Sequence, residues 1–207
     1  MLPDWAVLDG ALTTSVPQEV TVHSGIDAMV HAIEAYTSLY QKNSLSDTLA
    51  REAVTLLSQN IHEATFNGQN AECRGQMLLG SLYAGMAFAN SPVGAVHGLA
   101  YPIAGHFHIS HGFSNTLMLP PVLKYTAVDA AHMYAELAPC MFPEIKTGSA
   151  EEKTAQWIAG IERMCVELGV NPKLSALGIQ EKDLGYITDG GMSQERLMRN
   201  NYRKVEW

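Results

Sequence analysis

The segment from Ser24 to Tyr36 constrains the chain most, because it is strongly apolar yet carries a carboxylate and an imidazole at helical spacing. Its alanine, methionine, isoleucine and glutamate residues favour a helix, and Ser24 is placed to cap the start. Apolar residues surround this helix on almost every side, which is typical of a buried helix. Asp27 and His31 then lie on one face, one turn apart. Each needs a partner, since burying an unpaired charge is costly. A divalent cation and a private Asp–His hydrogen bond are both suitable, and such hydrogen bonds are the commoner case.

Residues 94–115 form a second unusual segment, which contains four of the 8 histidines. On a straight helix the 14-residue step from His97 to His111 would span about 21 Å, at about 1.5 Å per residue. Zinc–nitrogen bonds are only about 2.0–2.1 Å long, so the chain must fold back if both histidines bind one ion. Pro102 and Gly105 offer places for a break. The sequence therefore predicts a short helix carrying His97, a turn, and a new helix that starts near His111.

Together these segments resemble the metal-binding half of the iron-containing alcohol dehydrogenases. In that family one aspartate and three histidines hold a single divalent ion, and the resemblance implies Asp27, His31, His97 and His111 as the ligands here. The resemblance covers essentially the whole chain. Further matching residues flank the ligands: Leu8-Asp9, Leu12, His31-Ala32-Ile33-Glu34-Ala35, His97-Gly98, His111-Gly112 with Asn115, Leu119-Pro120-Pro121, Arg196-Leu197 and Asn200-Asn201.

One position departs from the family pattern. Many members have another histidine four residues after the third ligand, close to the nicotinamide and the substrate, and Tyr101 stands at that place here. A phenol donates a hydrogen bond near neutral pH but is a poor base. The proton-handling role of that histidine therefore does not transfer directly. We expect Tyr101 to face the cleft as a catalytic and cofactor-binding residue.

The residue pattern predicts an all-α fold of about eight helices, because period-2 strand patterns are few and strands do not alternate with helices. The phosphate-binding spacings G-x-G-x-x-G and the P-loop are not found. The resemblance implies that residues 1–207 are the C-terminal helical domain shared with the dehydroquinate synthase-like proteins. The Rossmann-like nucleotide domain that precedes it in the family is expected to be missing, and the C-terminal end to be truncated. The chain is thus interpreted as a fragment.

Helix boundaries follow from caps, apolar stripes and glycine or proline breaks. We expect helices at 17–22, 24–40, 46–62, 71–90, 113–125 (interrupted at Pro120-Pro121), 126–140, 149–168 and 179–189, with a break at Gly190-Gly191. The helix at 71–90 is rich in glycine and alanine, so we expect it to be a buried, central helix. Ser149 and Glu152 have the spacing of a capping box, and Gly169 is a helix stop.

Charge and cysteine content exclude several classes of function. The net charge is -8, with only 13 basic residues, which disfavours nucleic acid and anionic membranes as partners. The 3 cysteines form no C-x-x-C pair, so neither a disulfide framework nor a cysteine zinc site is expected. The chain also lacks a signal-peptide pattern, and its longest apolar run, 77–89, is too short to span a bilayer. We expect reduced thiols and a cytoplasmic location.

The resemblance implies the metal-binding half of an NAD(P)-dependent alcohol dehydrogenase. One aspartate and three histidines suit Fe²⁺ or Zn²⁺ without choosing between them. The ion would polarise the oxygen of a small alcohol or aldehyde, and a hydride would pass to or from the nicotinamide. Expected partners are that substrate, the Rossmann-like domain and further copies of the chain. The isolated chain is expected to bind the metal but not the nucleotide.

Two other classes of function remain open. One is a non-catalytic helical module, either stabilised by a metal or metal-free, that mediates assembly. The other is a metal-dependent helical hydrolase, although the sequence has no His-Asp dipeptide and no H-E-x-x-H motif. Among the remaining polar residues, Glu34 is either a partner of a metal ligand or purely structural. His106 and His108 belong to a cleft or a solvated loop, whereas His23, His62 and His132 are ordinary histidines.

Overall fold

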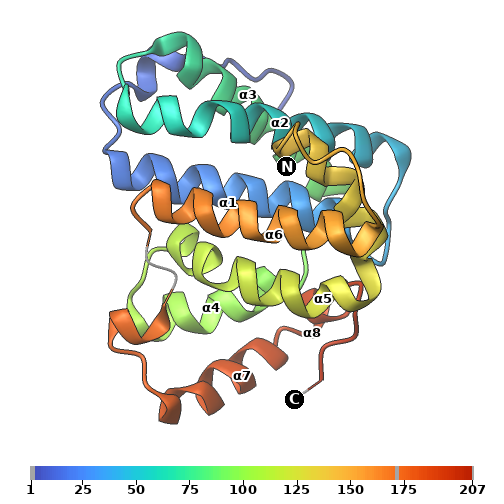
Figure 1. Cartoon of the computed structure of the whole chain (residues 1–207). Coiled ribbons are helices and arrows are strands. Elements are labelled where there is room, and N and C mark those ends of the chain that lie inside the picture. The colour runs from blue at the N-terminus through green and yellow to red at the C-terminus, as the bar shows by residue number, and fades with distance from the viewer. Residues whose placement is uncertain (1–2, 171–172, 207) are drawn as a thin grey trace.

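The computed structural model describes residues 3–170 and 173–206, and all regular secondary structure within them is helical (Figure 1). The all-α prediction is therefore confirmed. The elements in chain order are η1 (Gly10–Thr13), α1 (Gln18–Tyr36), α2 (Ser44–Phe66), α3 (Ala71–Asn90), α4 (Ala95–Phe107), α5 (His111–Met141), α6 (Ala150–Glu167), η2 (Leu174–Leu177), η3 (Glu181–Asp183), α7 (Leu184–Met192) and α8 (Glu195–Met198).

Helix α1 lies at the centre of the bundle. Helices α2 and α3 cover one side of it and α5 the other, with α4 beside α5 and α7 beyond α4 (Figure 1). The side chains of Ile26, Met29 and Ile33 are completely buried. Full burial of such a side chain is worth about 1.5–3 kcal/mol. The prediction that the helix carrying Asp27 and His31 is a core helix is confirmed.

The ends of α1 differ from the prediction. The helix begins at Gln18 and runs without interruption through Ser24, whose Oγ donates a hydrogen bond to the carbonyl of Val20 at 2.6 Å. Ser24 is therefore an internal helical residue and not a cap. The helix ends at Tyr36 and not at 40, because the chain then turns away and the Leu39 N–H donates to the carbonyl of Asn200 at 2.8 Å.

Helix α5 is one continuous helix where the sequence predicts two, at 113–125 and 126–140. It continues through Pro120, Pro121 and Pro139 to Met141. Each proline removes a backbone donor and disfavours the helix interior. Burial of the neighbouring residues, Leu119, Val122 and Leu123 among them, favours the continuous helix, and tertiary packing of this kind routinely overrides local preference.

Helix α3 has the predicted bounds, but the prediction that it is a central, buried helix is wrong. It lies on the outside of the bundle against α1, α2 and η1, and only one stripe of it is buried. Gly80 does permit close approach, since a Cβ there would lie 2.8 Å from Leu57 Cγ. Gly75 and Gly85, in contrast, have no neighbouring atom within 4 Å of such a Cβ. The small residues therefore serve packing only along the buried stripe, at Gly80, Ala84 and Ala87, and not around the whole helix.

The predicted break at Gly190-Gly191 is also wrong, because both glycines lie inside α7. A Cβ on Gly190 would come within 2.7 Å of Pro102 Cβ, and one on Gly191 within 2.6 Å of Leu99 Cδ2. These glycines allow α7 to pack directly on α4, the helix that carries His97.

The predicted start of α6 is confirmed, whereas that of α2 is shifted. The capping box of α6 is confirmed, since the Ser149 and Glu152 side chains each accept a hydrogen bond from the other's backbone N–H. Helix α2 starts earlier than predicted, with Asn43 as its cap and Ser46 as the reciprocal partner.

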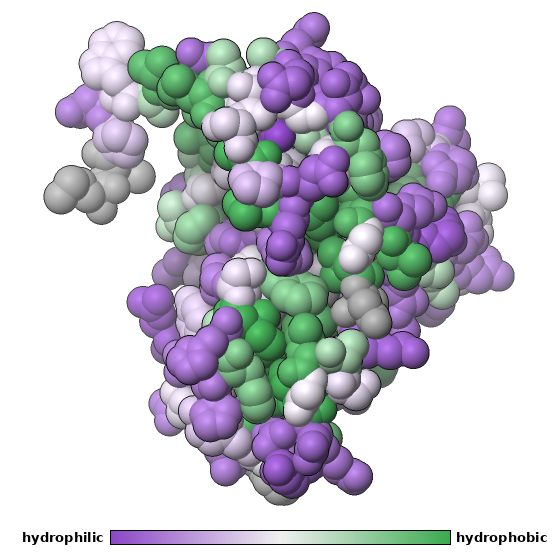
Figure 2. Space-filling model, turned by 90° about the vertical axis from the view of Figure 1, so that its left-hand side faces the viewer, coloured by the Kyte–Doolittle hydropathy of each residue, from purple (hydrophilic) through white to green (hydrophobic). Residues whose placement is uncertain are grey.

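The surface carries mixed polar and apolar groups, and the N-terminal segment projects from the body (Figure 2). In that segment the side chains of Trp5 and Val7 are each 90% exposed. Within the described residues, no helix combines the length and the apolar character needed to cross a membrane.

Candidate metal centre

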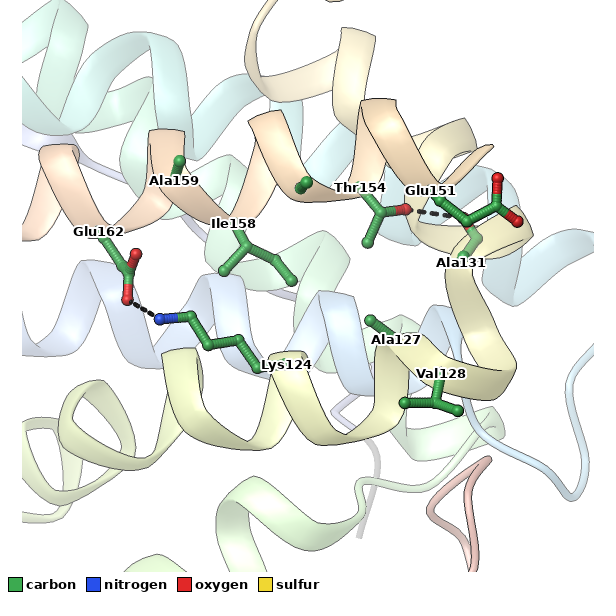
Figure 3. Close-up of a pocket in the computed structure, with 10 residues that line it drawn as sticks. Lys124, Ala127, Val128, Ala131, Glu151, Thr154, Ile158, Ala159 and Glu162 are labelled. Carbon is green, nitrogen blue, oxygen red and sulfur yellow. Dashed lines mark hydrogen bonds and ion pairs between the residues drawn. The ribbon is translucent and has the colours of Figure 1, made fainter. Parts of the chain in front are cut away.

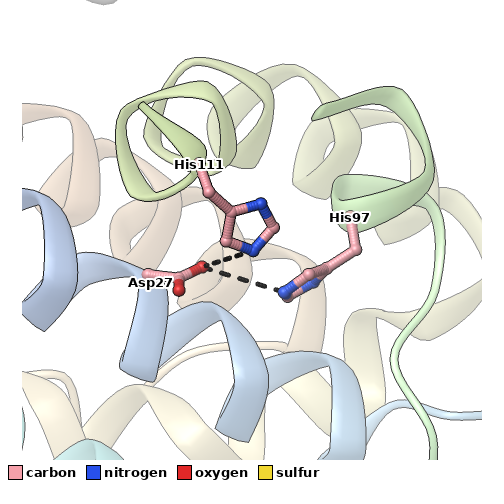
Figure 4. A group of neighbouring side chains, drawn as sticks. All are labelled: Asp27, His97 and His111. Atoms are coloured by element: carbon pink, nitrogen blue, oxygen red, sulfur yellow. Dashed lines mark ion pairs between the residues drawn. The ribbon is translucent and has the colours of Figure 1, made fainter. Parts of the chain in front are cut away.

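Three helices bring Asp27, His97 and His111 together. Asp27 Oδ1 on α1 lies 3.7 Å from His97 Nε2 on α4 and 3.7 Å from His111 Nε2 at the start of α5 (Figure 4). One ligand atom from each residue lies within 4.8 Å of the others. The chain folds back between the two histidines as predicted: α4 ends at Phe107, and His108 adopts a left-handed conformation with φ of 56° before α5 begins. The break does not fall at Pro102 or Gly105, because both residues lie inside α4.

His31 lies at the edge of this group. Its Nε2 is 3.1 Å from His97 Nε2, and its Nδ1 is 3.9 Å from Asp27 Oδ2. Its ring packs on Phe88 with the ring centres 4.5 Å apart. Two ligand atoms bound tetrahedrally to one zinc ion are about 3.3 Å apart, given bonds of about 2.0–2.1 Å. The distance from His97 Nε2 to His31 Nε2, 3.1 Å, is slightly shorter than that value, and the distance from His97 Nε2 to Asp27 Oδ1, 3.7 Å, is slightly longer.

Glu34 holds His97 in a fixed orientation. Glu34 Oε2 accepts a hydrogen bond from His97 Nδ1 at 2.6 Å, and Oε1 accepts from the Val96 backbone N–H at 2.7 Å. Both side chains are buried. The bond places the proton of His97 on Nδ1 and leaves the lone pair of Nε2 directed at the cluster. Of the two predicted roles of Glu34, the structure supports a partner of a candidate ligand, and that ligand is His97 on another helix.

Asn115 is a site residue to which the sequence assigned no role. Its Nδ2 lies 2.5 Å from Asp27 Oδ1 and 3.1 Å from His111 Nε2. Its Oδ1 is buried and has no hydrogen-bond partner among the described residues. Asn115 follows His111 by four residues on α5, the same one-turn spacing that joins Asp27 and His31. That repeated spacing was the available signal for its position.

Burial and charge act differently on the two inner histidines. Burial lowers the pKa of His31, and the charge of His97 lowers it further, against the opposing effect of Asp27. Burial also acts to lower the pKa of His97, but the hydrogen bond to Glu34 and the charges of Glu34 and Asp27 outweigh it, so the pKa of His97 is raised. The lowered pKa favours the neutral form of His31, which is the form that a metal requires.

The cluster opens into a cleft of about 490 Å³ that His31, His97 and His111 line. Tyr101, one turn after His97 on α4, also lines this cleft and is 42% exposed. Its ring stacks on that of His111, with the centres 5.7 Å apart and the planes 26° apart. Tyr101 therefore lies beside the candidate ligands, on the solvent side of the cluster.

The sequence profile described as "Fe-containing alcohol dehydrogenase family, C-terminal" matches residues 21–206. The chain belongs to the iron-containing alcohol dehydrogenase family. It is 37% identical over 198 residues to the long-chain-alcohol dehydrogenase 1 of Geobacillus thermodenitrificans, covering 96% of this chain and 50% of that protein. It is 32% identical over 199 residues to the 1,3-propanediol dehydrogenase of Klebsiella pneumoniae, covering 96% and 51%.

Solved structures agree with this assignment. The fold matches a crystal structure of a 1,3-propanediol oxidoreductase with a TM-score of 0.91 and 31% identity, over 95% of this chain and 51% of that one. The chain therefore spans about half the length of the iron-containing alcohol dehydrogenases that it matches. The resemblance inferred from the ligand motifs is confirmed at the level of the family and of its C-terminal helical fold.

The other histidines of the chain lie outside the cluster. His106 packs on Tyr186, with the ring centres 4.3 Å apart, and neither His106 nor His108 lines the cleft. His23 stacks on Phe113 with the ring centres 4.5 Å apart. These contacts are those of ordinary packed or surface histidines.

A separate pocket of about 370 Å³ lies between α5 and α6 (Figure 3). Its floor is apolar, with Val128 and Ile158 among the lining residues, and Lys124 pairs with Glu162 across one rim at 2.6 Å. No histidine lines it. This pocket therefore lacks the imidazoles that line the cleft beside His97 and His111.

Proposed function

We propose that this chain is the metal-binding catalytic half of an NAD(P)-dependent alcohol dehydrogenase. In this proposal Asp27, His31, His97 and His111 bind one Fe²⁺ or Zn²⁺ ion, and the substrate is a small alcohol or aldehyde. The observation that carries the proposal is the meeting of Asp27, His97 and His111 from three helices, with His31 in contact. The bound ion supplies Lewis-acid polarisation of the substrate oxygen, and the nicotinamide supplies the hydride chemistry.

The residues present fit such an ion. Three imidazoles and one carboxylate are donors that suit Fe²⁺ and Zn²⁺. The hydrogen bond to Glu34 leaves Nε2 of His97 free to act as a ligand atom. The Asn115 amide donates to the Asp27 carboxylate and so orients it toward the histidines. Without an ion, the cluster packs imidazole nitrogens and carboxylate oxygens together at high polar density in a half-buried site, and a cation relieves that cost.

The side chains of the cleft orient the substrate in this proposal. The cleft has space for a molecule of a few carbon atoms beside the three histidines. Tyr101, stacked on His111, donates a hydrogen bond from its phenol to the oxygen of the substrate or to the nicotinamide amide. Burial of His97 and Glu34 keeps water from that side of the cluster.

We also propose separate roles for two domains. Residues 1–207 act as one helical metal-binding domain, and a Rossmann-like domain outside these residues holds the dinucleotide phosphates. Phosphate binding of that kind uses backbone N–H groups at a glycine-rich turn before a helix, and the sequence has no such turn. Support for this division is the coverage of about half of each relative.

Metal analysis and thermal melts of the 207-residue chain test the proposal. Addition of Fe²⁺ or Zn²⁺ is expected to raise the melting temperature, because an ion that binds only the folded state stabilises it. Asp27→Asn should abolish this rise, whereas Asp4→Asn, an exposed control, should retain it. NAD alone should leave the melting temperature unchanged.

Two results would contradict the proposal. A chain that takes up no divalent ion, or an Asp27→Asn variant with unchanged metal affinity, would remove the metal assignment. Rapid reduction of NAD by the 207-residue chain alone, with an alcohol as substrate, would show that no separate domain is needed for dinucleotide binding.

A further inference from the structure

Arg196 of α8 and Arg199, the residue that follows this helix, line the cleft that contains the candidate ligands. They are three residues apart, so they lie on the same face of the helix. Both are exposed, whereas Leu197 and Met198 on the opposite face are buried. The segment 195–199 therefore turns its apolar side to the protein and the two arginine side chains to the cleft.

The backbone that carries these arginines is fixed relative to the metal cluster. Met198 packs so closely on α4 that a Cβ on Gly98, next to His97, would lie 2.6 Å from Met198 Cε. The Asn200 side chain donates to the Val93 carbonyl at 3.0 Å, and the Asn200 carbonyl accepts from the backbone N–H of Leu39 at 2.8 Å. The arginines are thus attached to the same helix and turn that position His97.

Neither arginine has an acidic partner. Other arginines of the chain form ion pairs, as Arg51 does with Glu136 and Arg203 with Asp129. The side chains of Arg196 and Arg199 form no ion pair or hydrogen bond with any described residue. The lining of the cleft contains no aspartate or glutamate. In a chain of net charge -8, this mouth is a local region of positive charge.

We infer that Arg196 and Arg199 bind an anionic group of the substrate, and that the substrate is a short hydroxy acid or the corresponding aldehyde acid. This inference rests on the proposed function, because it assigns the second end of a molecule whose oxygen lies at the metal cluster. Guanidinium groups bind carboxylates and sulfonates with paired, charge-assisted hydrogen bonds. The cleft of about 490 Å³ places both ends of a small molecule within one cavity.

A matched pair of probes tests the inference. The Zn²⁺-loaded chain is titrated with 3-hydroxypropionate and with 1,3-propanediol, which have the same number of carbon atoms and differ in a carboxylate against a hydroxymethyl group. Calorimetry should give tighter binding of the hydroxy acid. In the double variant Arg196→Gln/Arg199→Gln its affinity should fall about tenfold, as expected when hydrogen bonds to a charged group are lost. Arg163→Gln, at an exposed arginine of α6 outside this cleft, is the control and should bind like the parent.

Equal affinity for the two probes, or an unchanged affinity of the double variant, would overturn the inference. Inorganic pyrophosphate is the third probe: if its binding depends on the arginines and that of 3-hydroxypropionate does not, the arginines serve the dinucleotide phosphates and the substrate assignment is wrong. Metal uptake is measured separately on each protein. A chain without Zn²⁺ uptake refutes the proposed function, while arginine-dependent binding of the hydroxy acid to that metal-free chain still supports the anion site.

Discussion

Glu34 Oε2 lies 2.6 Å from His97 Nδ1 and accepts its proton in a hydrogen bond between α1 and α4. The other oxygen of Glu34 accepts the N–H of Val96, so one carboxylate orients both the imidazole and the backbone beside it. Partners of this kind tune metal ligands and are often as important as the ligands themselves.

Glu34→Gln is expected to weaken Zn²⁺ binding by about 10- to 100-fold, the range found when hydrogen-bond partners of metal ligands are lost. The amide carries no charge, so its oxygen accepts a weaker hydrogen bond from His97 Nδ1 and holds the imidazole less firmly. Competition against a chelator of known affinity measures the change. Glu52→Gln, at an exposed glutamate of α2, should retain the parent affinity. An unchanged affinity in Glu34→Gln would show that Glu34 is structural only.

Gly112→Ala is expected to disturb the site through packing. A Cβ at Gly112 would lie 2.5 Å from the backbone oxygen of His23 on α1, so the start of α5 must move. We expect a loss of about 1–3 kcal/mol in the free energy of unfolding, the cost of forcing extra volume into a packed region, together with weaker metal binding because His111 is adjacent. Urea denaturation and metal titration measure the two effects.

Gly85→Ala is the matched control for that substitution. Its Cβ meets no atom within 4 Å, and it lies inside α3. Alanine stabilises a helix interior by about 0.5–1 kcal/mol relative to glycine. Effects of opposite sign for the two alanines would support the steric explanation, whereas a stabilising Gly112→Ala would refute it.

Tyr101 is expected to contribute one hydrogen bond to catalysis. In the enzyme assembled with its nucleotide-binding half, Tyr101→Phe should lower kcat by up to about tenfold, the scale of a single net hydrogen bond. Tyr101→His introduces an imidazole, so the pH profile of kcat/KM should gain a titration near pH 6.5, the reference value for histidine. If Tyr101→Phe changes neither kcat nor KM, the phenol has no part in the reaction.

The thiol of Cys165 provides a pH-dependent prediction away from the site. Burial raises the pKa of Cys165 from its ordinary value of 9.0 to about 12, and the charge of Glu162 adds to the shift. Between these values the unfolded thiol loses its proton while the folded one keeps it, so stability falls as the pH rises from about 9 to about 12. Chemical denaturation at pH 8 and pH 10 should show a larger loss in the parent than in Cys165→Ala. Equal losses would contradict the assigned burial.

Local sequence signals predicted the helical class, the bounds of α3 and the capping box of α6, because each depends on residues near one another in the chain. They failed where distant contacts decide. Pro120 and Pro121 argue for a break, yet packing of the surrounding side chains keeps α5 continuous. Gly190 and Gly191 suggest a helix break, but both lie inside α7, where they allow close contact with Pro102 and Leu99 of α4.

The candidate site shows the same contrast between local signals and distant contacts. The resemblance to the family implied the four candidate ligands, whereas the one-turn spacing of Asp27 and His31 on α1 followed from the sequence directly. The sequence could not show that Glu34 supports His97, which lies 63 positions further along the chain, instead of the nearby His31. The role of the Asn115 amide likewise depends on the angle between α1 and α5, which no local pattern encodes.

Asp27 and His111 are 84 positions apart in the chain, yet their side-chain atoms approach to 3.7 Å. An ion held between them acts as a reversible cross-link between the early and middle parts of the polypeptide. Such a cross-link must release before α1 and α5 can separate. Withdrawal of the ion should therefore appear first as faster unfolding, with a shorter lifetime of the native state in denaturant, while the refolding rate changes less. Such a protein would retain its native fold when the metal is removed but would lose kinetic stability.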